Sequence, residues 1–339
     1  MTLVNVLPLA PSQRQDPVAP PGPTPRTRRV PWSKIRRRIA IWAMLTPTLI
    51  GLAVFFVYPL CANVYFSFTR YNLLTPPVWV GLKNYVYLFT QDPNVPTAAL
   101  NTLWLVLILV PVRIITAMAM AGLLARRKRA AGLWRTIFYI PALVPPVAAT
   151  IAFVFLFNPG VGVVNKVLGR IGIKGPLWFN DAAWSKPSLL LLGLWVMGDI
   201  MIIFLAALLD VPKEQYEAAS LDGANAVQRL RYVTLPNISP VVIFAIITGV
   251  IWALQYFTEA AVASSVASGK TGISVSLSQV LGYPDNSLLT YAEWLYVRGF
   301  TEFQLGYSAA LAVVLFVVTG VFLVFLLRRF RAFSPAERS

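Results

Sequence analysis

The chain has 339 residues, of which 57% are hydrophobic and 12% charged, and its mean hydropathy is +0.67. A soluble domain seldom has this composition, so an integral membrane protein is predicted. There is no His and a single Cys, which argues against zinc, haem, His-based catalysis and intrachain disulfides. No metal site and no catalytic residue are predicted. The net charge of +16 comes from basic clusters beside apolar runs, which is typical of cytoplasmic loops and not of nucleic-acid binding.

The N-terminal segment is rich in Pro and Arg and contains no apolar run. Residues 1–38 are predicted to form a disordered cytoplasmic tail and not a cleaved signal peptide. A transmembrane domain is predicted over residues 39–330, followed by a short C-terminal tail over residues 331–339.

Six apolar runs follow the tail, and a helix that crosses a bilayer needs roughly 20 such residues. They are Ile41–Asn63, Leu100–Leu124, Ile137–Phe157, Leu189–Leu209, Val241–Thr258 and Tyr307–Leu327. Because backbone groups in lipid must be satisfied internally, the predicted fold is all-α with six transmembrane helices. Lys and Arg concentrate in the segments on the same side as both termini, so both termini are predicted to be cytoplasmic.

A polar cytoplasmic loop, residues 211–237, separates the fourth and fifth runs. Pro212 suits a first helical turn, good helix formers follow up to Leu221, and Gly223 can adopt a positive φ that ends the helix. A second helical segment is predicted from Asn225 to Val233, closed by Pro236. These features alone fit either an amphipathic connector on the inner leaflet or a surface on which a partner docks.

The spacing of Glu217-Ala218-Ala219, Gly223 and Leu235-Pro236 resembles the signature loop of permease subunits of binding-protein-dependent ABC importers. The family pattern has Ile where this chain has Val233. Similarity to the sugar-uptake branch, the maltose, lactose and glycerol-3-phosphate type, extends over roughly residues 40–330. It is carried by Tyr58-Pro59, the run Val80 to Tyr85, the run Phe157 to Gly160, and the run Leu305 to Ala310. The segment Ser264 to Thr271 departs from that branch.

The resemblance implies a type I ABC importer permease in a bacterial cytoplasmic (inner) membrane. Its partners would be the lipid bilayer, a second homologous permease, a dimer of cytoplasmic ABC ATPase subunits and an extracytoplasmic solute-binding protein. ATP and Mg would bind to the ATPase, so no cofactor is expected on this chain. The loop would act as a coupling helix that inserts into the ATPase. The residues implied in coupling are Tyr216, Glu217, Ala218, Ala219, Asp222, Gly223, Ala224, Leu235 and Pro236.

An acid, Asp199, lies in the middle of the fourth run. Ionisable groups at that depth are costly to bury and mark functional sites, unless they form a structural pair, here with Arg113 of the second run. Gly249, Trp252 and Tyr256 share a helix face, which suits either packing or stacking on a sugar ring. Trp195 is predicted one helical turn from Asp199 on the same face. With the resemblance, the predicted substrate pathway comprises Trp195, Asp199, Gly249, Trp252, Gln255 and Tyr256.

Three alternatives bear on this interpretation. A permease for glycerol-3-phosphate or another polyol derivative would favour basic residues in the pathway, so Asp199 argues against it and Arg113 keeps it open. A self-sufficient secondary transporter usually has inverted repeats and several intramembrane charges, and neither is evident in the sequence. The run Ser268 to Thr271 resembles the end of a P-loop, but Ser264 replaces the first Gly, so ATP binding is not predicted there.

Overall fold

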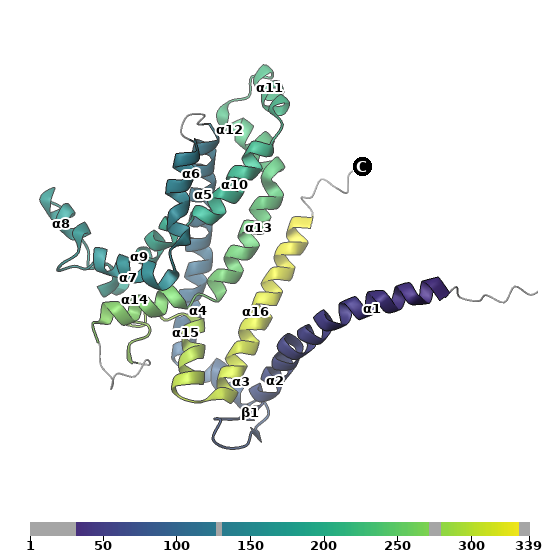
Figure 1. The fold of residues 1–339 in the computed structure, drawn as a ribbon. Coiled ribbons are helices and arrows are strands. Elements are labelled where there is room, and N and C mark those ends of the chain that lie inside the picture. The colour runs from purple at the N-terminus through teal and green to yellow at the C-terminus, as the bar shows by residue number, and fades with distance from the viewer. Residues whose placement is uncertain (1–31, 127–130, 271–278, 332–339) are drawn as a thin grey trace, which may run out of the picture. The chain divides into compact units, whose positions relative to one another are not determined.

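The computed structural model describes residues 32–126, 131–270 and 279–331 (Figure 1). The predicted N-terminal tail lies mostly outside these residues, and the first helix, α1 (Trp32–Leu52), begins within its last part. The predicted C-terminal tail lies outside them from residue 332 onward, as does Thr271 of the P-loop-like run. The chain divides into two units, residues 1–58 and residues 59–339.

The first unit contains α1 and a π-helical segment, Ala53–Val57. The second is almost entirely helical, apart from a two-stranded antiparallel sheet in which Thr69 pairs with Trp79. Its strands are β1 (Thr69–Arg70) and β2 (Val78–Trp79). Its helices, with α2 starting at the division, are α2 (Tyr58–Ser67), α3 (Lys83–Thr90), α4 (Asn94–Trp104), α5 (Val110–Ala125), α6 (Ala131–Tyr139), α7 (Pro146–Leu156), α8 (Val163–Arg170), α9 (Ala182–Trp195), α10 (Gly198–Asp210), α11 (Lys213–Leu221), α12 (Ala226–Arg229), α13 (Leu235–Leu254), α14 (Thr258–Ser268), α15 (Tyr291–Tyr296) and α16 (Leu305–Arg331).

Four helical runs are long and apolar enough to cross a membrane, and two bent helix pairs bring the total to as many as six in the described part of the chain. The four runs are Ile39–Ser67, Asn94–Ala125, Ala226–Leu254 and Leu305–Arg328. The predicted third and fourth spans fall on the bent pairs, so each of these two runs consists of two helices joined at a bend. The pairs are Gly132–Leu143 with Pro146–Leu156, bent by 97°, and Ala182–Trp195 with Gly198–Asp210, bent by 49°.

The two breaks have different causes. In the first pair, Pro145 and Pro146 lack the N–H groups that would continue the helix. In the second pair, Val196 and Met197 leave helical geometry, and Gly198 starts α10 directly against α6. A Cβ at Gly198 would lie 2.3 Å from the carbonyl oxygen of Phe138, so only glycine allows this approach.

Three of the prolines that lie inside apolar helical runs share one local pattern. In each case a five-residue π-helical segment finishes two residues before the proline: Ala53–Val57 before Pro59, Leu105–Leu109 before Pro111, and Leu230–Thr234 before Pro236. The wider π turn relieves the clash between the proline ring and the preceding turn. The prediction that Pro236 closes a helix is therefore wrong, because the helix continues from Ala226 to Leu254.

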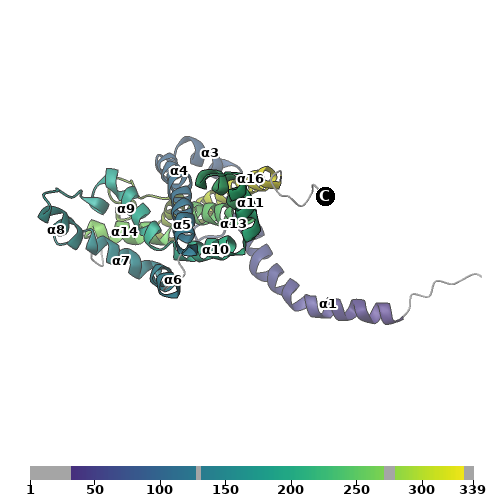
Figure 2. The same cartoon turned by 90° about the horizontal axis from the view of Figure 1, so that it is seen from above.

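The core of the second unit lies where α5, α10 and α13 pack side by side, as Figures 1 and 2 show. Small residues permit the close packing: Ala117 of α5 and Ala245 of α13 are almost fully buried. A Cβ at Gly249 would lie 2.8 Å from Cγ1 of Val110. Met201 and Phe204 of α10 fill the space between these helices, and neither is exposed.

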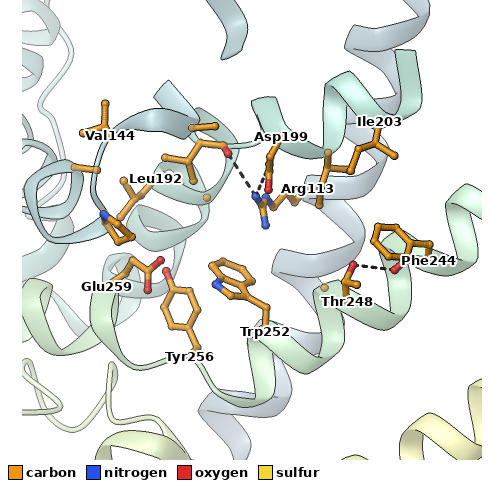
Figure 3. Close-up of a pocket in the computed structure, with 17 residues that line it drawn as sticks. Arg113, Val144, Leu192, Asp199, Ile203, Phe244, Thr248, Trp252, Tyr256 and Glu259 are labelled. Atoms are coloured by element: carbon orange, nitrogen blue, oxygen red, sulfur yellow. Dashed lines mark hydrogen bonds and ion pairs between the residues drawn. The ribbon is translucent and has the colours of Figure 1, made fainter. Parts of the chain in front are cut away.

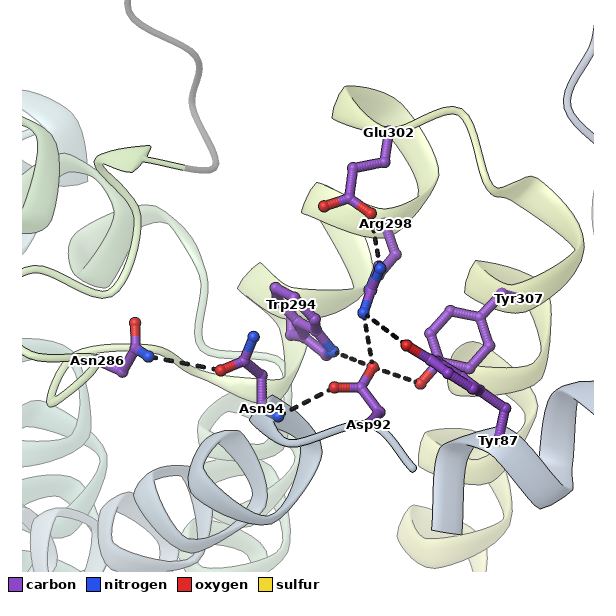
Figure 4. A network of polar contacts seen from close by, with 8 residues as sticks. All are labelled: Tyr87, Asp92, Asn94, Asn286, Trp294, Arg298, Glu302 and Tyr307. Atoms are coloured by element: carbon purple, nitrogen blue, oxygen red, sulfur yellow. Dashed lines mark hydrogen bonds and ion pairs between the residues drawn. The ribbon is translucent and has the colours of Figure 1, made fainter. Parts of the chain in front are cut away.

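A second core cluster joins the α3–α4 turn to α15 and α16, around Asp92, whose side chain is 0% exposed. Its Oδ2 accepts hydrogen bonds from Trp294 Nε1 at 2.9 Å and Tyr307 Oη at 2.7 Å, and forms an ion pair with Arg298 at 3.2 Å (Figure 4). Burial raises the pKa of this carboxyl, but the hydrogen bonds and the guanidinium outweigh burial, so the pKa of Asp92 lies below its usual range. The network fixes three segments that are distant in the sequence.

Candidate functional site

A pocket of about 430 Å³ opens beside the break between α9 and α10 (Figure 3). Its walls come from α5, α7, α9, α10, α13 and α14. Most of the lining is apolar, and the charged groups that reach it among the described residues are Arg113, Asp199 and Glu259. A mostly apolar pocket with a few convergent polar groups is the usual form of a small-molecule site.

An ion pair spans the helix break. Arg113 of α5 donates from Nη2 to Asp199 Oδ1 at 2.8 Å and to the carbonyl oxygen of Val196 at 3.4 Å. That carbonyl belongs to the residue that caps the C-terminus of α9, and Asp199 lies in the first turn of α10, where a carboxylate is favoured by the helix dipole. The sequence analysis gave a structural pair between Arg113 and Asp199 as an alternative to a functional role for Asp199. This pairing is confirmed.

The two partners differ in exposure. The Arg113 side chain is 10% exposed, whereas the Asp199 side chain is 53% exposed. The base is therefore more deeply buried than the acid, although both side chains line the pocket.

Aromatic rings form the opposite wall. Trp252 lies edge to face with Tyr256, with ring centroids 4.8 Å apart, and the guanidinium carbon of Arg113 lies 5.0 Å from the Trp252 ring centroid. Figure 3 shows the Glu259 carboxyl beside the Tyr256 ring. Burial raises the pKa of Glu259 above its usual value, although Arg113 opposes the shift.

The structure brings together four of the six predicted pathway residues: Asp199, Gly249, Trp252 and Tyr256 all line the pocket. Trp195 is not among its lining residues; it ends α9, so the break removes it from the helix face of Asp199, and its ring packs 5.3 Å from that of Phe153. Gln255, which ends α13, is exposed and does not line the pocket either.

The sequence interpretation did not include Glu259, Thr248 and Phe244, which also line the pocket. The signal for Glu259 is its position three residues after Tyr256, just past the end of the fifth apolar run. Thr248 and Phe244 lie near Gly249 on the same helix, and Thr248 donates to the carbonyl of Phe244 at 2.8 Å. Among the residues with described positions, no group of three or more acidic, Cys or His side chains could hold a metal ion.

The predicted helix from Lys213 to Leu221 is confirmed as α11, and Gly223 follows it with a φ of +76°. Asn225 begins α12 with a capping box, in which its side chain accepts from the Gln228 N–H and Gln228 accepts from the Asn225 N–H. The loop is tied back to the long helix by Tyr216, whose hydroxyl is 2.9 Å from that of Thr234. The segment is an ordered helix–turn–helix.

Its surface is largely open. Glu217, Ala218, Asp222, Gly223 and Pro236 are exposed, while Tyr216, Ala219, Ala224 and Leu235 are half-buried. Two apolar side chains project beside them, Leu221 at 90% and Val227 at 72% exposed. Glu217 takes part in no ion pair within the described ranges. Apolar side chains and an acid on one exposed loop suit a docking surface.

Residues 113–332 match the family model described as "Binding-protein-dependent transport system inner membrane component". The chain is 34% identical over 292 residues to the probable ABC transporter permease protein YesP of Bacillus subtilis, covering 86% of this chain and 90% of that protein. It is 32% identical to the sulfoquinovosyl glycerol transport system permease protein SmoG of Agrobacterium fabrum, over 86% and 92%. It is 30% identical to the arabinooligosaccharides transport system permease protein AraP of Bacillus subtilis, over 83% and 85%.

Among solved structures, the fold is similar to a chain of a bacterial ABC transporter involved in the import of the acidic polysaccharide alginate, with a TM-score of 0.73 at 23% identity. That match covers 89% of this chain and 98% of the other. A second crystal structure, of the alginate transporter in complex with an alginate pentasaccharide-bound periplasmic protein, matches with a TM-score of 0.74 at 22% identity, over 90% and 98%.

Proposed function

The chain belongs to the family of binding-protein-dependent transport system inner membrane components, and we propose that it is one of two permease subunits of an ATP-driven importer of saccharides. In this proposal each bent helix pair is one span, which gives six spans with both termini in the cytoplasm of a bacterial cell. The saccharide cargo is supported by relatives named for arabinooligosaccharides and sulfoquinovosyl glycerol.

The pocket beside the helix break forms half of the translocation pathway in this account. Trp252 offers an aromatic surface for the apolar face of a sugar ring, and Asp199 offers oxygens that accept hydrogen bonds from hydroxyls. The Asp199 side chain is half exposed, so this wall is available to the second permease, which would close the pathway.

The observation that carries the proposal is a continuous helix between loop and pocket. The 29-residue run Ala226–Leu254 begins in the exposed loop and carries Trp252 at its far end. At 1.5 Å per residue it spans about 40 Å. A continuous helix of this length couples a displacement at the loop to the aromatic wall, which fits the rigid-body form of alternating access.

The ATPase dimer is the proposed source of that displacement. Glu217 would pair with a basic residue of the ATPase, and Gly223 provides the bend. The exposed alanine at 218 lets the partner approach closely. ATP and Mg would bind to the ATPase, and an extracytoplasmic solute-binding protein would deliver the saccharide; the fold neighbour that holds a periplasmic protein supports such delivery.

Purification of the tagged chain in mild detergent, followed by mass spectrometry, tests this assembly. Recovery of an ATPase and a second multi-span permease is expected. Glu217→Lys is expected to abolish ATP-driven uptake in cells while the protein stays in the membrane. Glu214→Lys is the matched control, because Glu214 is also exposed on α11 and is not a predicted coupling residue. Normal uptake in the Glu217→Lys variant, or purification of the chain alone as an active carrier, would contradict the proposal.

A further inference from the structure

The charge of the cargo is not set by the family. One relative is named for arabinooligosaccharides, which are neutral, another is named for sulfoquinovosyl glycerol, which carries a sulfonate, and a structural neighbour imports an acidic polysaccharide. The charged groups of the pocket are therefore the features of this chain that bear on the choice.

Three side chains supply all the charged groups among the described lining residues of the pocket. Arg113 is the single cation, and Asp199 and Glu259 are the acids. Arg113 already binds a full opposite charge at 2.8 Å and rests against the Trp252 ring. The lining thus carries no net positive charge, whether Glu259 is ionised or neutral.

We propose that this pocket selects uncharged saccharides and rejects anionic ones such as uronates, with Asp199 and Glu259 as the residues that set this preference. The inference rests on the proposed role of the pocket in saccharide transport. Its physical basis is geometric: the Arg113 side chain is 10% exposed and already paired with a carboxylate, while the Asp199 side chain is 53% exposed. An anionic group in the pocket would lie next to a carboxylate, and like charges so placed in a binding site repel each other and weaken binding.

The neutral choice also fits the hydrogen-bonding groups. Carboxylates accept from hydroxyl donors, which every sugar ring supplies, but they cannot accept from another carboxylate. The apolar face of a pyranose or furanose ring suits the aromatic wall formed by Trp252 and Tyr256. A neutral oligosaccharide can donate hydrogen bonds to the carboxylates and stack on the aromatic wall at the same time.

The test measures binding to the purified assembly without the solute-binding protein, so that the permease alone determines selectivity. The probes are two pairs that differ only by oxidation at C6: galactobiose with digalacturonate, and cellobiose with cellobiouronate. Affinities come from saturation-transfer NMR titrations. The neutral member of a pair is expected to bind at least about tenfold more tightly than its acid.

Asp199→Asn supplies the decisive variant, because the amide oxygen still accepts from Arg113 while the negative charge is gone. The acid probe is expected to gain about tenfold relative to its neutral partner, and Glu259→Gln should add to this gain. A gain in binding cannot result from misfolding. Asp285→Asn is the control, since Asp285 is exposed outside the pocket, and it should leave the ratio unchanged.

The outcomes separate the two claims. Tighter binding of the uronate by the unaltered protein, or an unchanged ratio in Asp199→Asn, would overturn the charge preference and leave the saccharide pathway standing. Failure of all four probes to bind would overturn the preference together with the assignment of this pocket to saccharide transport.

Discussion

Removing either member of the Arg113–Asp199 pair should have unequal effects on stability, because the two side chains are unequally buried. Asp199→Leu leaves an arginine side chain that is 10% exposed without its counter-charge. Loss of one partner from a buried pair costs about 3–5 kcal/mol, and since the Trp252 contact remains, we expect about 3 kcal/mol. Arg113→Met leaves an acid that is 53% exposed and can be hydrated, so a cost nearer that of an exposed pair, about 1 kcal/mol, is expected.

The double variant sharpens the test. Removing both charges leaves no unpaired ion, and replacing a pair by apolar groups is often close to neutral. We therefore expect a cost of about 1 kcal/mol for Arg113→Met with Asp199→Leu, against about 4 kcal/mol if the single effects were additive.

Thermal unfolding midpoints of the purified variants give this ranking, with Glu214→Leu as a control that should change stability by less than about 0.5 kcal/mol. An Arg113→Met variant that is as unstable as Asp199→Leu, or a double variant with additive loss, would refute the reasoning.

Three further predictions concern the second core cluster, around Asp92 and α15, and the loop. The Glu293 carboxyl is fully buried, and burial raises its pKa to about 8. Because the folded form holds the proton more tightly than the unfolded form, stability should fall as pH rises from about 4.5 to about 8, by on the order of 3 kcal/mol at neutral pH. Glu293→Gln should remove this decline in unfolding midpoints measured at pH 5 and pH 8. Asp92→Ala should cost about 3 kcal/mol of stability, because Arg298 loses its buried partner. Glu302→Ala should cost under about 1 kcal/mol in the same melts, because the Glu302 side chain is 32% exposed. Equal losses of stability in the two variants would count against the proposed role of Asp92. Gly223→Val should destabilise the turn by about 1–2 kcal/mol because φ is +76°, and hydrogen exchange of α11 should rise while that of α13 is unchanged.

Local features of the sequence predicted the loop well and the spans less well. Helix α11 and the positive φ of Gly223 follow from short-range rules on capping and turn residues, which act within a few positions. Such short-range rules do not predict the break between α9 and α10, because no proline lies at it. It depends on contacts of Gly198 with Phe138 and of Arg113 with Val196, which are far apart in the sequence.

The sequence predicted only the part of the pocket that a helical period brings together. A helical period places Gly249, Trp252 and Tyr256 together, and the structure keeps them on one wall. The same period placed Trp195 beside Asp199, which is wrong because the helix is broken between them. Glu259 lies beyond the end of α13, so no helical period includes it, and it reaches the pocket through the turn into α14.

The most direct test of the account is uptake by proteoliposomes that contain the purified assembly, with Mg-ATP enclosed and the solute-binding protein and a mixture of neutral di- and trisaccharides outside. Mass spectrometry of the lumen reads out the transported sugar. The account predicts uptake that requires ATP and the binding protein and is lost in Glu217→Lys. Uptake that proceeds without ATP, by this chain alone, would contradict it.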